Sequence, residues 1–177
     1  MSDRTPIHIR RNIESYDDPY IEQESPAEHT PCKRCGSIYT AGRWYLKDQV
    51  PAGRTARKLG GDFRIPTRPT PTTCPACRKQ ADKVPGGVLK LTGRFINDHK
   101  VEIINLIHNQ SGKAQAVNPL ERIMDMQSNG SEITITTTNE KLAQRIGRAL
   151  HKAYSGTIEY QFSEDTKLAR VNWRREE

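Results

Sequence analysis

The stretch "EITITTTNEKLAQRIGRALHKAYSGTIEYQF", residues 132–162, indicates the class of fold more clearly than any other part of the chain. Its opening residues alternate isoleucine with threonine, a period of two that is typical of a strand with one buried face. A helix is predicted over residues 140–154, because Thr137 and Glu140 have the spacing of a capping box and Gly156 supplies a C-terminal stop. The last six residues alternate again, so the stretch predicts strand, helix, strand.

The residues on either side continue this pattern. Residues 169–174 alternate apolar and polar side chains and predict a last strand, while "GVLKLTG", residues 87–93, predicts a first one. Residues 98–110 carry apolar side chains three and four positions apart, which is typical of a helix. Strands therefore stand at both ends of this part of the chain.

A short second helix is expected over residues 118–128. Asn118 would cap it, Pro119 would occupy its first position, and its inward-facing residues would be Leu120, Ile123 and Met124. The predicted order is β-α-α-β-α-β-β. This order favours an α+β sandwich in which helices cover one side of a four-stranded sheet.

The four cysteines form two pairs, Cys32 with Cys35 and Cys74 with Cys77, each with two residues between its members. Such a gap lets both thiolates of a pair turn toward one ion, and two pairs complete the tetrahedral sulfur shell that structural zinc prefers. A redox dithiol needs only one pair, and a disulfide framework is not expected in a reducing cytoplasm. We therefore predict a structural Zn²⁺ site whose four positions are all filled by thiolate.

The residues around the cysteines predict a small zinc module over residues 31–83. A hairpin is expected over residues 37–46 and a helix after Cys77, the order found in treble-clef and zinc-ribbon modules. Between them lies a long segment rich in glycine and proline, and a loop of this length is usually functional or disordered. Its basic residues predict contact with a polyanion: Arg54, Arg57, Lys58, Arg64 and Arg68.

The chain has a formal net charge of +7, and the positive charge is concentrated in one segment. Residues 32–83 carry 12 Lys and Arg against 3 Asp and Glu, whereas residues 1–31 carry 3 against 7. A local excess of this kind attracts nucleic acid, although a basic loop can also serve solubility alone. We expect an acidic, flexible tail over residues 1–30, then the zinc module, then an α+β domain over residues 84–177.

The helix predicted over residues 140–154 carries four basic residues on one side: Lys141, Arg145, Arg148 and Lys152. At about 100° per residue they form a stripe roughly 60° wide beside the apolar stripe. A solvated helix face usually mixes both signs of charge, whereas these four repel one another unless an anion balances them. The stripe is therefore either a solvated helix face or a phosphate-binding surface, and phosphate binding is favoured. The open face of the sheet has no aromatic residue for base stacking, so sequence-specific readout is not expected.

Nothing in the sequence predicts an enzyme. The five histidines lack metal-ligand spacing, and no serine or cysteine has a partnered base. The "SGK" of residues 111–113 lacks the earlier glycine of a phosphate-binding loop, since Ile107 stands in its place. No targeting segment or membrane span is recognised either. We expect a cytoplasmic protein without membrane contact and without a small-molecule substrate.

Two such cysteine pairs, followed by "LAQRIGRALHKAYSG" and "VNWRRE", resemble the N-terminal part of the nonsense-mediated-decay protein 3 family. That family is the eukaryotic and archaeal adaptor of the large ribosomal subunit. The chain is more similar to short, largely uncharacterised bacterial relatives that open with a segment like "TPIHIRR", residues 5–11. The resemblance implies zinc ligation by the four cysteines and a ribosomal partner. The larger family's further cysteine pairs and export signals have no counterpart here, so nuclear export is not expected.

These observations predict a non-enzymatic, zinc-stabilised protein that binds RNA or a ribosomal subunit. It would contact phosphate through the basic loop 54–68 and the helix stripe 141–152. The alternative is a zinc-containing adaptor or regulator that binds another protein without nucleic acid. An enzyme of unrecognised type is a further rival.

Overall fold

The computed structural model describes residue 20 and residues 25–51, 70–163 and 168–177. The described residues 25–51 and 70–82 hold strands β1 (Thr30–Pro31), β2 (Ile38–Thr40) and β3 (Arg43–Tyr45), the short helix η1 (Lys47–Gln49) and helix α1 (Pro75–Asp82). We call them the cysteine region. The sheet region, residues 86–163 and 168–177, holds β4 (Gly87–Thr92), α2 (Phe95–Val117), β5 (Ile123–Asn129), β6 (Glu132–Thr137), α3 (Glu140–Tyr154), β7 (Thr157–Phe162) and β8 (Ala169–Arg174).

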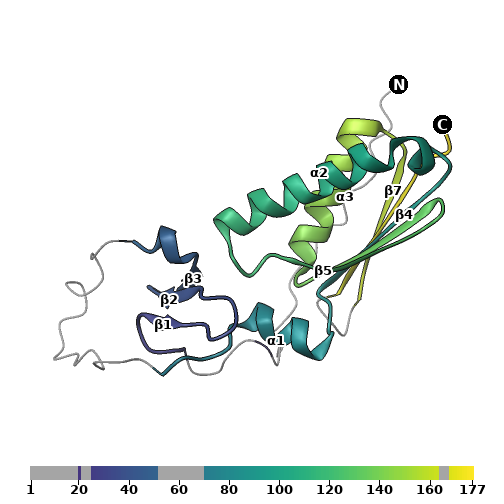
Figure 1. Ribbon diagram of the computed structural model, residues 1–177. Helices are drawn as coiled ribbons and strands as arrows, with labels where there is room; N and C mark the ends of the chain where they lie inside the picture. Colours follow the sequence, from purple (N-terminus) through teal and green to yellow (C-terminus); the bar gives the residue numbers. More distant parts are fainter. Residues whose placement is uncertain (1–19, 21–24, 52–69, 164–167) are drawn as a thin grey trace.

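The sheet region is a five-stranded sheet with its two long helices on one face (Figure 1). The strand order is β5-β6-β4-β8-β7, so β4 is central, antiparallel to β6 and parallel to β8. Helix α3 lies directly on β4 and β8, and α2 packs against α3. The predicted α+β class is confirmed, but the sheet has five strands and not four.

The fifth strand replaces the helix predicted over residues 118–128, and that prediction is wrong. Helix α2 ends before Asn118, whose side chain accepts a hydrogen bond from the amide of Leu120 and so closes a turn. The chain then pairs with β6 and reverses at Gly130, whose φ of +57° suits glycine. The Asn129-Gly130 pair between two extended segments is a hairpin signal, and it decides the structure here.

Helix α3 begins at Glu140 as predicted, but its cap is Asn139. The Asn139 side chain accepts a hydrogen bond from the amide of Leu142, while the Thr137 hydroxyl donates to the carbonyl of Asn139. The predicted capping box of Thr137 and Glu140 is therefore wrong. Thr137 belongs to the preceding strand, and asparagine is as strong an N-cap as threonine.

The core of the sheet region lies between the sheet and the helices. Fifteen buried residues form one cluster, to which β4, β6, β8 and both helices contribute. Gly147 lets α3 approach the sheet closely, because a methyl group at this position would lie 2.7 Å from Cγ1 of Val171. The apolar alternation that predicted these strands and α3 thus corresponds to a real packed layer.

The opposite face of the sheet is polar. The register places Thr134, Lys90 and Asn172 side by side across three strands of this face. Among the described residues no aromatic side chain alternates onto it, as the sequence predicts. Helices that would be long and apolar enough for a membrane span do not occur in the described part of the chain.

Candidate metal centre

Two turns of the cysteine region bring the cysteines together. Cys32 follows β1, its amide donates to the carbonyl of Ser37, and the amide of Gly36 donates back to the carbonyl of Cys32. Gly36 has a φ of +74°, which glycine adopts without strain. Cys74 is the N-cap residue of α1 and Cys77 lies in its first turn. A tight turn and a helix N-terminus therefore present one pair each.

The four sulfur atoms form one cluster, with all four within 4.8 Å of one another. The Sγ atoms of Cys32 and Cys77 are 3.9 Å apart, and those of Cys35 and Cys74 are 3.7 Å apart. Both distances far exceed the ~2.05 Å of a disulfide bond. A tetrahedral ion with sulfur at ~2.3 Å requires sulfur–sulfur distances of about 3.8 Å. The cluster of the four predicted ligands is confirmed, and its dimensions fit a metal ion.

Burial and hydrogen bonding divide the four thiols. Cys32, Cys74 and Cys77 are buried, and burial raises the pKa of Cys74 and of Cys77. Cys35 is exposed. Partial desolvation still acts to raise the pKa of Cys35. Hydrogen bonds with Ser37 and with the guanidinium of Arg122 outweigh this effect and lower the pKa to about 6. Since thiolates are the metal-binding form, the hydrogen bond from Arg122 favours the form of Cys35 that can bind a metal.

Arg122 is a member of the site that the sequence did not predict. It immediately precedes β5, yet its Nη2 lies 3.1 Å from Sγ of Cys35 and its Nη1 lies 3.4 Å from Sγ of Cys77. Burial acts to lower the pKa of Arg122, but the Cys35 thiolate raises it above the ordinary value. No local pattern marks this arginine, because 45 residues separate it from Cys77.

The basic residues predicted to bind phosphate fall into two groups. Arg54, Arg57, Lys58, Arg64 and Arg68 lie outside the described residues. On α3, Lys141, Arg148 and Lys152 are exposed, and no ion pair joins them to an acid within the described part of the chain. The fourth residue of the stripe, Arg145, has a carboxylate beside it.

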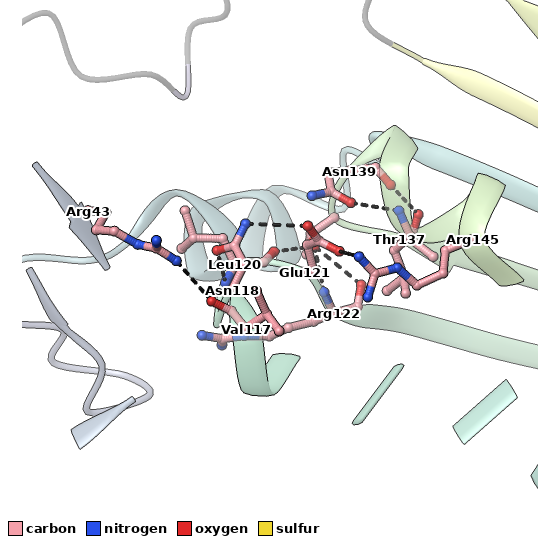
Figure 2. A network of polar contacts seen from close by, with 11 residues as sticks. Arg43, Val117, Asn118, Leu120, Glu121, Arg122, Thr137, Asn139 and Arg145 are labelled. Atoms are coloured by element: carbon pink, nitrogen blue, oxygen red, sulfur yellow. Dashed lines mark hydrogen bonds and ion pairs between the residues drawn. The ribbon is translucent and has the colours of Figure 1, made fainter. Parts of the chain in front are cut away.

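That carboxylate is Glu121, a buried residue of the turn before β5 (Figure 2). Its Oε2 lies 3.9 Å from Nη2 of Arg145, which is an ion-pair distance. This oxygen accepts no hydrogen bond among the described residues. Its Oε1 lies 3.5 Å from Nδ2 of Asn118. The positive charge of Arg145 is therefore balanced within the protein. Sequence reasoning missed this because Glu121 comes from a different element.

Arg43 completes the contacts between the two regions. Its Nη2 donates to the carbonyl of Val117 at 2.9 Å, joining strand β3 to the end of α2 (Figure 2). Leu120 packs against the small core around the cysteines. The end of α2 and the turn that links it to β5 therefore contact the cysteine region.

No protein-family model, no curated protein and no solved structure matches this chain. The resemblance to the ribosomal adaptor family stays a prediction from the sequence. The clustered cysteines and the exposed basic residues of α3 are the features of the structure that bear on function.

Proposed function

We propose that the chain is a non-enzymatic, zinc-stabilised protein that binds RNA, with a ribosomal subunit as the partner that its sequence resemblance favours. The observation that carries the metal half is the cluster of four sulfurs within 4.8 Å of one another, in which two sulfur–sulfur distances of 3.9 and 3.7 Å match those around a tetrahedral ion. Four thiolates leave no position open for water or substrate, so the ion is structural and not catalytic.

Zinc is the metal that fits this donor set best. Four thiolates in tetrahedral geometry select zinc or iron among the common ions, and zinc needs no redox partner. A hairpin followed by a helix that carries the second pair is the arrangement of treble-clef and zinc-ribbon modules, which are zinc proteins. Bound zinc would hold the hairpin β2–β3 against the start of α1.

The RNA half rests on positive charge that has no ion-pair partner among the described residues. Lys141, Arg148 and Lys152 share one side of α3 without an acid to balance them among the described residues. Residues 32–83 add 12 basic residues against 3 acidic ones. Such a surface favours a polyanion, and phosphate backbone is the commonest one in a cell. With the open sheet face free of aromatic residues, contact is to phosphate and not to bases.

Salt dependence of RNA binding tests this proposal. Fluorescence polarisation with a labelled oligouridylate, and co-sedimentation with purified ribosomal subunits, would be measured over a series of salt concentrations. Each lost phosphate contact reduces the slope of log K against log salt by roughly 0.7 to 0.9. We expect the R148Q/K152Q variant to bind with a slope about 1.5 shallower than wild type.

The matched control is K113Q/R170Q, which removes the same charge from exposed positions on α2 and on the open sheet face. Its slope should equal that of wild type. If both double variants weaken binding equally, α3 is not the contact surface. If wild type binds neither probe at low salt, the alternative of a protein-binding adaptor takes first place.

A further inference from the structure

Arg122 connects the metal centre to a part of the chain that supplies no ligand. Its backbone belongs to the sheet region, where its amide donates to the hydroxyl of Thr138 at 2.9 Å and its carbonyl accepts from the amide of Thr138 at 2.9 Å. Its guanidinium, in contrast, lies on the sulfurs of Cys35 and Cys77. One side chain therefore spans the boundary between the two regions.

The guanidinium is held in a fixed direction. Its Nε donates to the carbonyl of Pro119 at 2.5 Å, which leaves the two terminal nitrogens for the two sulfurs. All three nitrogens thus have acceptors, and the planar fork of arginine suits two acceptors side by side. The two sulfurs that accept from this fork belong to different cysteine pairs, so the contact joins both halves of the cluster.

We infer that Arg122 is a positioning residue of the metal centre, which neutralises part of its charge and ties the cysteine region to the sheet region. This inference rests on the proposed zinc site. A divalent ion with four thiolates carries a net charge of −2, and the guanidinium reduces it to −1. Loss of the ion lets the four sulfurs separate, so Arg122 loses its paired acceptors and the two regions lose this contact.

Arg43 provides a matched control for this role. It also donates across the boundary from a guanidinium, but its acceptor is the carbonyl of Val117 and not a sulfur. The R43Q variant removes the same charge and the same kind of contact at the same boundary. Any effect that R122Q shows and R43Q does not show belongs to the contact with the metal centre.

The test is the rate of zinc transfer from the full chain to a chromophoric chelator. Partners that bond to metal ligands typically contribute 10- to 100-fold to metal affinity, so we expect R122Q to release zinc at least about 10 times faster than wild type. R122K keeps the charge but not the fork, and should release zinc at an intermediate rate. R43Q should behave as wild type.

Equal release rates for wild type and R122Q would overturn the inference, and so would equal acceleration by R43Q. If R122Q fails to fold, R122K against R43Q makes the same comparison. The zinc content of purified wild type tests the proposed function separately, because an absence of zinc there removes the site itself and not only the role of Arg122.

A second readout tests the tie between the two regions. Residual dipolar couplings of the zinc-loaded protein would be fitted for the cysteine region and the sheet region separately. Wild type should give one common alignment, whereas R122Q should give two that differ. A common alignment in both proteins would show that Arg122 does not fix the placement of the regions.

Discussion

The cysteine region and the sheet region are held together by different means. The buried core of the cysteine region consists of Tyr39, Trp44 and Ala76 together with three of the four metal ligands. The sheet region buries a cluster of fifteen residues, among them Leu91 and Trp173, which are fully enclosed. A core as small as the first rarely folds unaided, whereas one like the second does not need a metal.

Under the proposed zinc site, the chain would divide its stability between metal binding in the cysteine region and apolar burial in the sheet region. In small modules the free energy of metal binding is the free energy of folding. Substitution of a cysteine should therefore unfold the cysteine region, whereas truncation of a buried apolar side chain should destabilise the sheet region.

The largest effect is expected from C74S. Cys74 is completely buried at the start of α1, and three remaining ligands cannot complete the sulfur shell. The variant should lose its zinc, measured by elemental mass spectrometry, and the protected amides of β2, β3 and α1, measured by hydrogen exchange. Amides of β4 and α3 should stay protected. Loss of protection in both regions would show that they fold as one unit.

The converse change is L91A in the central strand of the sheet. Leu91 is fully buried, and truncation of such a residue costs about 2–5 kcal/mol of the free energy of unfolding. Denaturant unfolding followed by far-ultraviolet circular dichroism measures this loss. Zinc content should not change. V101A on the exposed face of α2 is the control and should stay within about 0.5 kcal/mol of wild type.

A smaller effect is expected from R145Q on helix α3. Removing this guanidinium leaves the buried carboxylate of Glu121 without its ion-pair partner, which costs about 1–3 kcal/mol. R148Q on the same helix face has no such partner to lose among the described residues and should be nearly neutral. Equal stability of the two variants would mean that Arg145 is a solvated residue like its neighbours.

The smallest effect concerns Glu28, whose carboxylate accepts a hydrogen bond from the Thr40 hydroxyl at 2.6 Å and others from the amide of Ala41. The Thr40 hydrogen bond lowers the pKa of Glu28 below its ordinary value of 4.5. The stabilisation is therefore present above pH 4.5 and is lost as pH falls through the lowered pKa.

Because Glu28 is partly solvated, E28Q should cost less than about 1 kcal/mol at neutral pH. A carbon NMR titration of the Glu28 carboxyl should show a midpoint below 4.5. A midpoint at or above this value would contradict the hydrogen bonds that the structure shows at the hairpin turn.

Local patterns predicted most of this molecule. Alternation identified β4, β6, β7 and β8, and the paired spacing of Cys32, Cys35, Cys74 and Cys77 identified the cluster. Each of these signals lies within a few residues of sequence. The wrong prediction over residues 118–128 has a local cause too, because the Asn118-Pro119 pair is typical of a helix start while the Asn129-Gly130 turn pairs this segment with β6.

The features that the sequence could not supply are all contacts between distant residues. Arg122 reaches Cys35 across 87 residues, and Glu121 meets Arg145 from another element. A single residue has no periodicity, so the sequence on either side of Arg122 or Glu121 does not predict these partners. Only the fold shows that the turn before β5 contacts the cysteine cluster through Arg122 and helix α3 through Glu121.

The two tryptophans offer the most direct test, since Trp44 lies in the core of the cysteine region and Trp173 in that of the sheet region. Fluorine NMR of the fluorotryptophan-labelled protein would follow both, with W44F for assignment. On addition of a zinc chelator, we expect the Trp44 signal to move to its unfolded position while the Trp173 signal stays. Both signals moving together, or neither moving, would contradict this expectation.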